Sequence, residues 1–458
     1  MTNLNWKAQL RKIELNSNNN AVECEDDFLT FDDIIHAKKD VMEKGLKLTI
    51  SEVNELFKEN RWEDALALIY PVDEKFPEIV KSGNDTEIRA KAAFALGQLM
   101  RFDEAISELT ICVEREPENF LYNSSLAYTA YNSLYAANNR EIFLRGKPRQ
   151  ERIELAHKYF GKAQELRPDG ITNYYREGML YKQIEGKTRK SVYLFETAVK
   201  NWKVLDEENK KARSQERKNY VKSLYQLASC LVNLDLPNRA LKFLNECISE
   251  DEESNYICPL FKYFALGKVY YRLGKFEKAR DALNFALSCN TKQFPDYVYE
   301  LLARVLLAMD EPQNALETIN KIPERKRRPY CRWTESDILC ALRDFDGARK
   351  ILLRATERDN RSRHKTLVRL AKIEYINGNF EKSGEYAREA GKFFHEKWGG
   401  ILGDALFWEA VSAYRLGDYT RAKKLTTDLR DFNPRYPKLQ QLLQKLEQSE
   451  SPLEKEVL

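Results

Sequence analysis

A small side chain recurs along this chain at intervals of a few tens of residues, and this recurrence restricts the fold more than any other feature. In most of these places a large apolar residue follows four positions later, as Leu283 follows Ala279 and Phe195 follows Ser191. Spacings of three and four residues put side chains on one helix face, where a small residue lets a second helix approach closely. Such a period is typical of stacked helical repeats. The ten small residues are Ala65, Ala105, Ala156, Ser191, Ala240, Ala279, Ala315, Ala348, Ser383 and Ala422.

One unit, residues 260–290, shows the complete pattern. Its spaced positions are Tyr263, Leu266, Gly267, Tyr270, Gly274, Phe276, Ala279, Leu283 and Ala286. This order of aromatic, small and large apolar residues resembles the tetratricopeptide repeat, a pair of antiparallel helices. The resemblance implies an all-α, right-handed superhelical solenoid, here with about ten helix-turn-helix repeats.

The chain is expected to have four parts. Residues 1–45 are predicted to form an acidic N-terminal arm and helix, 46–170 three repeats, 171–437 seven repeats, and 438–458 a capping helix and tail. Two stretches exceed the repeat period. The first is a basic insertion near 139–152, and the second, KVLDEENKKARSQERKN, is interpreted as a charged helix extension. Insertions in a solenoid project from one face and can carry contacts.

Composition restricts the class of protein. The 75 basic and 71 acidic residues nearly balance, and a net charge of +4 is too small to identify a nucleic-acid partner. The N-terminus has no apolar signal region, and no stretch has the 18 or so consecutive apolar residues of a membrane span. The eight cysteines are far apart, without a CxxC pair, and Cys112 and Cys247 occupy expected core positions. These features predict a cytoplasmic protein with reduced thiols and no membrane span.

The sequence offers no convincing chemical site. The four histidines are scattered, without HExxH or a neighbouring cysteine, so no metal site or nucleophile is predicted. The tripeptide at Gly186 resembles the end of a phosphate loop, but Tyr181 stands where that motif needs a glycine, and a turn is expected instead. The stretch from Gly399 is interpreted as another turn. We expect no cofactor and no enzyme activity.

The resemblance implies that the first helix of each repeat, helix A, lines a concave groove. Aromatic and basic residues dominate the groove positions, and Tyr, Trp and Arg are the types that anchor interfaces. A groove of this kind would suit an acidic or extended segment of a protein partner, although single rings could simply pack between adjacent helices. The chaperone-tail clamp of the family is unsupported, because only its last element is present, at Lys365 and Arg369. The predicted partner-binding residues are Tyr225, Phe264, Lys268, Tyr271, Arg272, Arg304, Tyr330, Trp333, Lys365, Arg369, Lys372, Tyr375, Tyr414 and Arg415.

A basic segment leaves a second possibility open. Residues 321–372 contain 16 basic and 7 acidic residues. Basic side chains mixed with aromatic rings can grip RNA or an acidic peptide, and they also occur in solvated turns. The leading hypothesis is a non-enzymatic scaffold or adaptor; the alternatives are an RNA-binding repeat protein using this surface and a regulatory subunit of a complex with a separate enzyme. The possible contact residues are Arg325, Lys326, Arg327 and Arg328, with Arg145, Lys147 and Arg149 of the insertion.

Overall fold

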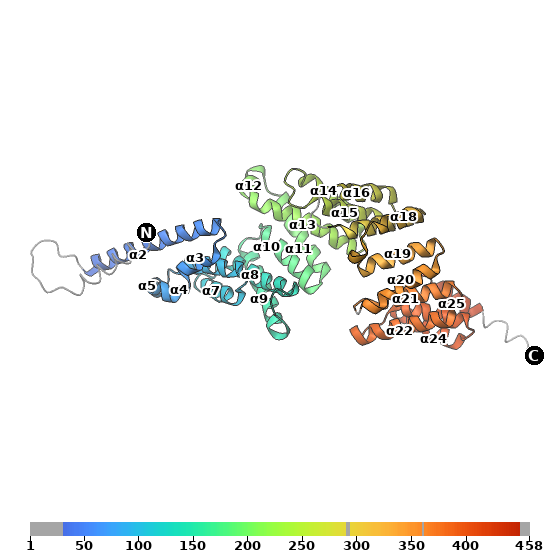
Figure 1. Ribbon diagram of the computed structural model, residues 1–458. Helices are drawn as coiled ribbons and strands as arrows, with labels where there is room; N and C mark the ends of the chain where they lie inside the picture. The colour runs from blue at the N-terminus through green and yellow to red at the C-terminus, as the bar shows by residue number, and fades with distance from the viewer. Residues whose placement is uncertain (1–30, 290–293, 360, 449–458) are drawn as a thin grey trace, which may run out of the picture. The chain divides into compact units, whose positions relative to one another are not determined.

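The computed structural model describes residues 31–289, 294–359 and 361–448, and all regular elements within these ranges are helices (Figure 1). This confirms the expected all-α class. The chain divides into two compact units, Met1–Asp235 and Leu236–Leu458, called unit 1 and unit 2 below. The division falls inside the fifth predicted repeat, between its two helices. The first 30 residues of the predicted N-terminal arm, including Cys24, and the predicted tail after residue 448 lie outside the described residues.

Unit 1 contains the first four helix pairs and the first helix of the fifth. Its A helices are α2 (Phe31–Lys58), α6 (Thr86–Gln98), α8 (Phe120–Asn138), α10 (Thr172–Met179) with its continuation η1 (Leu180–Glu185), and α13 (Ser214–Asn233). The second helices, or B helices, are α3 (Trp62–Ile69), α7 (Phe102–Arg115), α9 (Gly146–Leu166) and α11 (Thr188–Lys203). The short helices between pairs are α4 (Val72–Lys75), α5 (Pro77–Ser82) and α12 (Glu207–Ala212).

Unit 2 continues the alternation and ends in a single helix. Its A helices are α15 (Pro259–Arg272), α17 (Asp296–Ala308), α19 (Pro329–Ala341), α21 (Arg363–Ile376) and α23 (Gly403–Arg415). Its B helices are α14 (Pro237–Glu250), α16 (Phe276–Ser288), α18 (Pro312–Asn320), α20 (Phe345–Arg358), α22 (Phe380–Trp398) and α24 (Tyr419–Phe432). A 3-10 turn, η2 (Glu324–Lys326), precedes α19. The last described helix, α25 (Leu439–Gln448), packs on α24 and α23 and buries Leu439, Leu442 and Leu446; it is called the capping helix below.

The small residues lie where the two helices of a repeat meet. All ten have a relative exposure of 0%. Gly267 on α15 faces Leu283 on α16 so closely that an added Cβ would lie 2.6 Å from the leucine Cγ. Gly178 on α10 faces Phe195 on α11 in the same way, also at 2.6 Å. Helix pairs at this separation bury apolar side chains on both helices, and this burial drives folding.

Repeat four contains one residue more than the repeat at 260–290, and a π-helical turn absorbs it. Thirteen positions separate Gly178 from Ser191, whereas twelve separate Gly267 from Ala279. The extra residue falls in η1, whose wider turn accommodates an insertion without breaking the helix. Gly186 ends this turn with a φ of 70°, so the expected turn at this tripeptide is confirmed.

The two longer stretches became helix extensions. The basic insertion forms a loop after α8 and then the first turns of α9, which is 21 residues long. The charged stretch before repeat five forms α12 and the first turns of the 20-residue α13. No disulfide joins the described cysteines, and burial raises the pKa of the Cys112 thiol to about 12.

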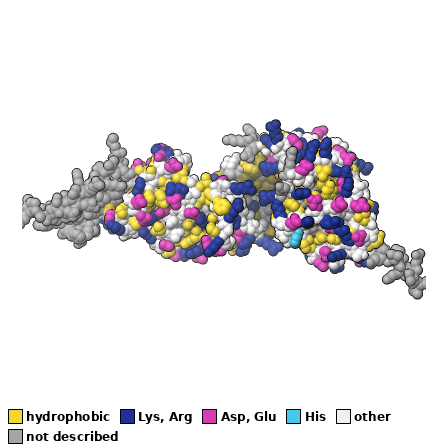
Figure 2. Space-filling view, turned by 60° about the horizontal axis from the view of Figure 1, so that its bottom comes forward, with side chains coloured by type: hydrophobic (Ala, Val, Ile, Leu, Met, Phe, Trp, Pro, Cys, Tyr) yellow, Lys and Arg dark blue, Asp and Glu magenta, His cyan; other side chains and the backbone are white. Residues whose placement is uncertain are grey.

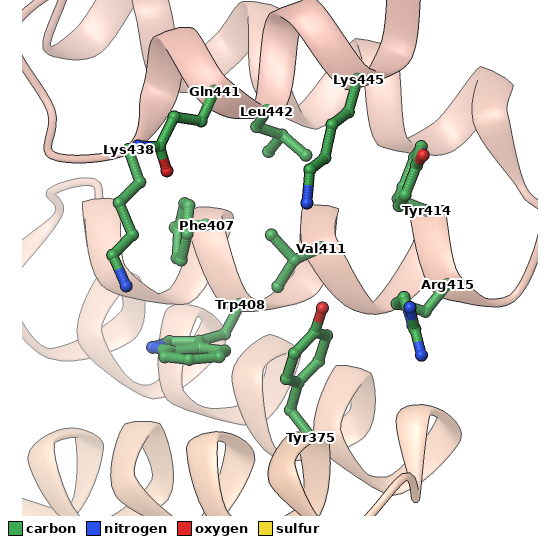
Figure 3. A pocket seen from close by; sticks show the side chains of 10 residues that line it. All are labelled: Tyr375, Phe407, Trp408, Val411, Tyr414, Arg415, Lys438, Gln441, Leu442 and Lys445. Atoms are coloured by element: carbon green, nitrogen blue, oxygen red, sulfur yellow. The ribbon is translucent and has the colours of Figure 1, made fainter. Parts of the chain in front are cut away.

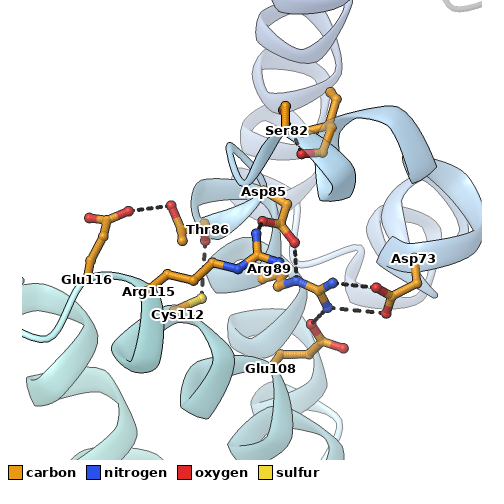
Figure 4. Close-up of polar contacts among 10 residues, drawn as sticks. Asp73, Ser82, Asp85, Thr86, Arg89, Glu108, Cys112, Arg115 and Glu116 are labelled. Carbon is orange, nitrogen blue, oxygen red and sulfur yellow. Dashed lines mark hydrogen bonds and ion pairs between the residues drawn. The ribbon is translucent and has the colours of Figure 1, made fainter.

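Unit 1 holds a buried cation that joins its second repeat to the short helix α4 (Figure 4). The guanidinium of Arg89 on α6 is almost fully buried and pairs with Asp85, Asp73 and Glu108, the last at 2.6 Å. Arg115 on α7 also pairs with Asp85. A buried charge needs partners to offset its lost hydration. The hydrogen bond from Arg89 lowers the pKa of Asp73, and the network ties α4 to the helix pair formed by α6 and α7.

Replacing Gly267 with alanine should destabilise unit 2. The new methyl group would overlap Leu283, which is fully buried, so the leucine side chain would have to shift within the core. We expect a loss of about 1–3 kcal/mol in the free energy of unfolding, measured by urea titration. Gly161 in the interior of α9 is the matched control, because nothing lies within 4 Å of its added Cβ. Gly161→Ala should gain about 0.5–1 kcal/mol, and equal effects of the two changes would contradict the close approach.

The stability of unit 1 should depend on pH through His157. Its Nδ1 lies 2.8 Å from Glu177 and its Nε2 2.8 Å from Glu185. Burial by itself lowers the pKa of His157, but the two carboxylates more than offset it, so the net shift is upward. The stabilisation is therefore complete below the unfolded pKa of about 6.5 and is lost as pH rises through the raised folded pKa.

We expect wild type to exceed His157→Gln in unfolding free energy by more at about pH 6 than at about pH 9. Urea titrations at both values measure this difference. The exposed His395, replaced in the same way, is the control. A difference between wild type and His157→Gln that stays constant with pH would contradict the arrangement.

Candidate partner-binding site

The A helices of unit 2 carry nearly all the residues predicted to bind a partner. Tyr225 lies on α13 in unit 1, and the other thirteen are in unit 2. Four are on α15, one on α17, two on α19, four on α21 and two on α23. Because each A helix packs beside the next, helices that carry residues scattered over about 150 positions of sequence lie side by side in this unit.

A pocket of about 670 Å³ opens between α15, α17, α19 and α21. We call it the arginine pocket. Five of its lining residues were predicted as partner-binding, and the rest are apolar, hydroxyl or acidic. The lining consists of Tyr271, Glu300, Arg304, Leu307, Ala308, Tyr330, Trp333, Thr334, Asp337 and Arg369.

Trp333 is held firmly at the wall of the arginine pocket. Its indole Nε1 donates a hydrogen bond of 2.9 Å to the Thr366 hydroxyl on α21. The charged groups of Lys365 and Arg369 lie 5.5 Å and 5.1 Å from its rings. Cations at this distance are attracted to the indole face. A hydrogen bond and two cations therefore restrict the Trp333 side chain. Less side-chain entropy would be lost if a ligand bound against it.

A group of three cations, Lys268, Arg272 and Arg304, lies at the α15 side of this pocket. The Arg304 guanidinium sits 5.0 Å over the Tyr271 ring, and its Nε is 3.9 Å from Glu300. Partial burial lowers the pKa of Lys268, and the neighbouring charges of Arg272 and Arg304 lower it further. Within the described ranges neither Lys268 nor Arg272 forms an ion pair. The surface therefore carries positive charge that its own acids do not neutralise.

The acids of the arginine pocket are already engaged. Glu300 is buried and accepts a 2.5 Å hydrogen bond from the Thr334 hydroxyl. Burial raises its pKa, although the hydroxyl and the nearby Arg304 and Arg369 favour its charged form. Asp337 lies 3.5 Å from Arg369. These contacts hold the basic side chains in place and leave the cations on α15 without a matching acid.

The basic block before α19 has a more structural role than its sequence suggested. Arg327 donates to the backbone carbonyl of Ile322 at 3.0 Å and pairs with Glu335 at 2.6 Å. Lys326 lies over the ring of Phe294, and Arg328 lies 3.4 Å from Asp296, while Arg325 is exposed. The insertion residues also contact their own unit: Arg145 stacks on Phe143, Lys147 pairs with Glu151, and Arg149 donates to the Ile184 carbonyl.

Some predicted aromatic residues pack between neighbouring A helices. Phe264 meets Tyr297 edge-on with ring centroids 4.7 Å apart. Tyr330 donates a 2.7 Å hydrogen bond to Asp296, and burial together with this bond raises its pKa. For these rings the simpler interpretation, packing between helices, describes what the structure shows. Lys372, by contrast, is exposed on α21.

A second pocket, of about 260 Å³, lies between α21, α23 and α25 (Figure 3). We call it the aromatic pocket. Tyr375, Tyr414 and Arg415 were predicted, but the contribution of the capping helix was missed, because the sequence pattern of α25 indicated only a solvating helix. The lining consists of Tyr375, Phe407, Trp408, Val411, Tyr414, Arg415, Lys438, Gln441, Leu442 and Lys445.

Unit 1 contains a cation that the sequence did not single out. The Arg176 guanidinium on α10 lies 3.6 Å from the centre of the Tyr128 ring on α8, and burial lowers the pKa of Arg176. Arg176 lies on α10 just before the π-helical turn.

The face of the molecule that is visible in Figure 2 carries both basic and acidic side chains, in line with the balanced composition.

A membrane-spanning helix and a cluster of metal ligands are both absent from the described part of the chain. None of its helices is both long and apolar enough to cross a bilayer. Within the same ranges no three His, Cys, Asp or Glu side chains gather as metal ligands would.

Comparison with known proteins agrees with the repeat geometry. Models of the tetratricopeptide repeat match residues 221–254, 264–329 and 404–435. No curated protein matches the sequence. The apo form of the quorum sensor NprR from B. thuringiensis is similar with a TM-score of 0.52 and 13% identity, over 77% of this chain and 99% of that one. A tetratricopeptide repeat protein from Parabacteroides merdae ATCC 43184 has a TM-score of 0.41 and 15% identity, over 59% and 92%.

The three repeat matches fall on helix pairs whose small positions are fully buried, and a solved structure shares the fold. The chain therefore contains tetratricopeptide repeats within residues 221–254, 264–329 and 404–435.

Proposed function

We propose that this protein is a non-catalytic interaction scaffold and that the A-helix face of unit 2 binds an extended, acidic segment of a partner protein. The observation that carries the proposal is the group formed by Lys268, Arg272 and Arg304 beside the arginine pocket. The three like charges repel one another in the free protein, and neither Lys268 nor Arg272 has an acidic partner among the described residues. An acidic ligand would offset that repulsion, which favours this class of partner.

The aromatic residues beside these cations support an extended peptide. Tyr271 and Trp333 are both partly exposed and line a pocket of about 670 Å³. Aromatic side chains bury large areas at low entropy cost, so they are suited to anchor a chain laid along the groove. The remaining acids are already bound to groups of the protein, so an incoming carboxylate would meet little repulsion.

The RNA alternative has weaker support. It relied on the excess charge of residues 321–372, but Arg327, Arg332 and Arg349 in this segment pair with Glu335, Glu324 and Glu374. These ion pairs largely neutralise the positive charge of the three arginines within the fold. An acidic protein segment is therefore favoured over RNA, and RNA binding is measured in the same experiment.

The test removes the three cations together, as Lys268→Gln, Arg272→Gln and Arg304→Gln. The probe is a fluorescein-labelled polyglutamate peptide, followed by fluorescence anisotropy. Affinity should fall by about tenfold or more, because electrostatic complementarity is lost while packing is not. Circular dichroism should be unchanged, since Lys268 and Arg272 are exposed and Arg304 is partly so.

A charge-matched control separates this site from general attraction. Lys278, Lys350 and Lys382 are exposed cations on the B helices of the same unit, and their replacement by glutamine should leave affinity nearly unchanged. Equal losses in both triple variants would refute a specific groove. Tighter binding of a single-stranded RNA oligonucleotide than of the peptide, with the same loss in the groove variant, would replace the proposal with the RNA alternative.

A further inference from the structure

The aromatic pocket has apolar walls that the capping helix leaves uncovered. Trp408 on α23 stands between Tyr375 on α21 and Phe407, with ring centroids 5.6 Å and 5.4 Å away. Val411 and Leu442 face the same space (Figure 3). Trp408 is only partly buried, so part of its indole faces the cavity. Such a partly exposed tryptophan in a concave site is a common anchor point in interfaces.

The rim of this pocket is positively charged. Lys438 and Lys445 approach from the α25 side, and Arg415 lies at the end of α23 (Figure 3). The Arg415 guanidinium is 4.8 Å from the centre of the Phe380 ring. Among the residues that the structure describes, no acidic side chain lines the pocket. Within the described residues Arg415 and Lys438 form no ion pair. Apolar walls with a cationic rim are complementary to an apolar group flanked by negative charge.

The size of the pocket limits the occupant. Small-molecule and cofactor sites usually enclose about 300–1,000 Å³, and this pocket has about 260 Å³. It is therefore matched to one large side chain rather than to a cofactor. The aromatic walls favour a ring, since aromatic pairs gain by offset or edge-on contact at separations of about 4.5–7 Å.

We propose that the aromatic pocket binds one aromatic side chain of a partner protein and that acidic residues flank this side chain in the partner. The inference rests on the proposed function, because it places this anchor on the same acidic segment that the cations on α15 and α17 attract. The pocket shares α21 with the arginine pocket, so both sites lie along one run of packed A helices. The aromatic residue fixes the position of the segment, and the acids supply attraction.

The experiment compares three fluorescein-labelled peptides by anisotropy. The first has a phenylalanine between two pairs of glutamates, the second has alanine in its place, and the third has glutamines in place of the glutamates. Wild type should bind the first about tenfold more tightly than either of the others, since losing an aromatic anchor costs more than about 1 kcal/mol.

Val411→Phe is the main variant, because it fills the cavity without removing a packed ring. It should abolish the preference for phenylalanine over alanine while the weaker attraction to glutamates persists. Lys438→Gln should weaken the acidic peptides and leave the glutamine peptide unchanged. Trp408→Ala should also abolish the preference, but it removes ring contacts, so its melting temperature must be compared with wild type. Tyr193→Ala, at an exposed ring of unit 1, is the aromatic control.

The outcomes separate the two proposals. If the acidic peptides bind but phenylalanine and alanine are equivalent, or if Val411→Phe keeps the preference, the pocket proposal is wrong and the acidic groove stands. If no acidic peptide binds wild type, the proposed function fails as well. If sedimentation finds a dimer that Val411→Phe dissociates, a second copy of the chain covers the pocket, which also overturns the proposal.

Discussion

The close contact between the two helices of each repeat is the constraint on which the structure depends. All ten small residues at this contact are fully buried. At Gly267 even a methyl group would overlap the facing leucine. A helix pair of this kind cannot bury all of its apolar surface alone. Each pair therefore packs against the next pair, and the array grows one repeat at a time.

This packing determines which surface of unit 2 stays uncovered. B helices and one side of each A helix are used for contacts within and between repeats. The remaining side of the A helices in unit 2 carries Tyr271, Arg304, Trp333 and Arg369 around one pocket. Since the helices are fixed by their cores, these side chains are held in place before any partner arrives. Preorganisation reduces the entropy lost on binding.

Charge is used in two ways in this chain. In unit 1 the buried guanidinium of Arg89 is surrounded by three carboxylates, so its charge stabilises the fold. In unit 2 the acids near the arginine pocket are bound by Thr334, Arg369 and Tyr330, whereas Lys268 and Arg272 form no ion pair with any acid that the structure describes. The difference lies in the number of acids within reach. A nearly neutral sequence therefore has a locally positive surface.

The sequence by itself determined the helical repeat, the residues at the helix contact and the enrichment of the A helices in aromatic and basic residues, because these follow from periodic spacing along a single helix. It did not determine which basic residues remain available. Arg327 was named as a possible contact residue, and its guanidinium pairs with Glu335. The extra residue of repeat four became a π-helical turn. The aromatic pocket also needed the tertiary structure. Trp408 and Lys438 lie on different helices, and only the packing of α25 on α23 brings them to one cavity. Ion pairs and cavities depend on side chains from different helices of the packed repeats. The local pattern of the sequence does not specify which of these side chains meet.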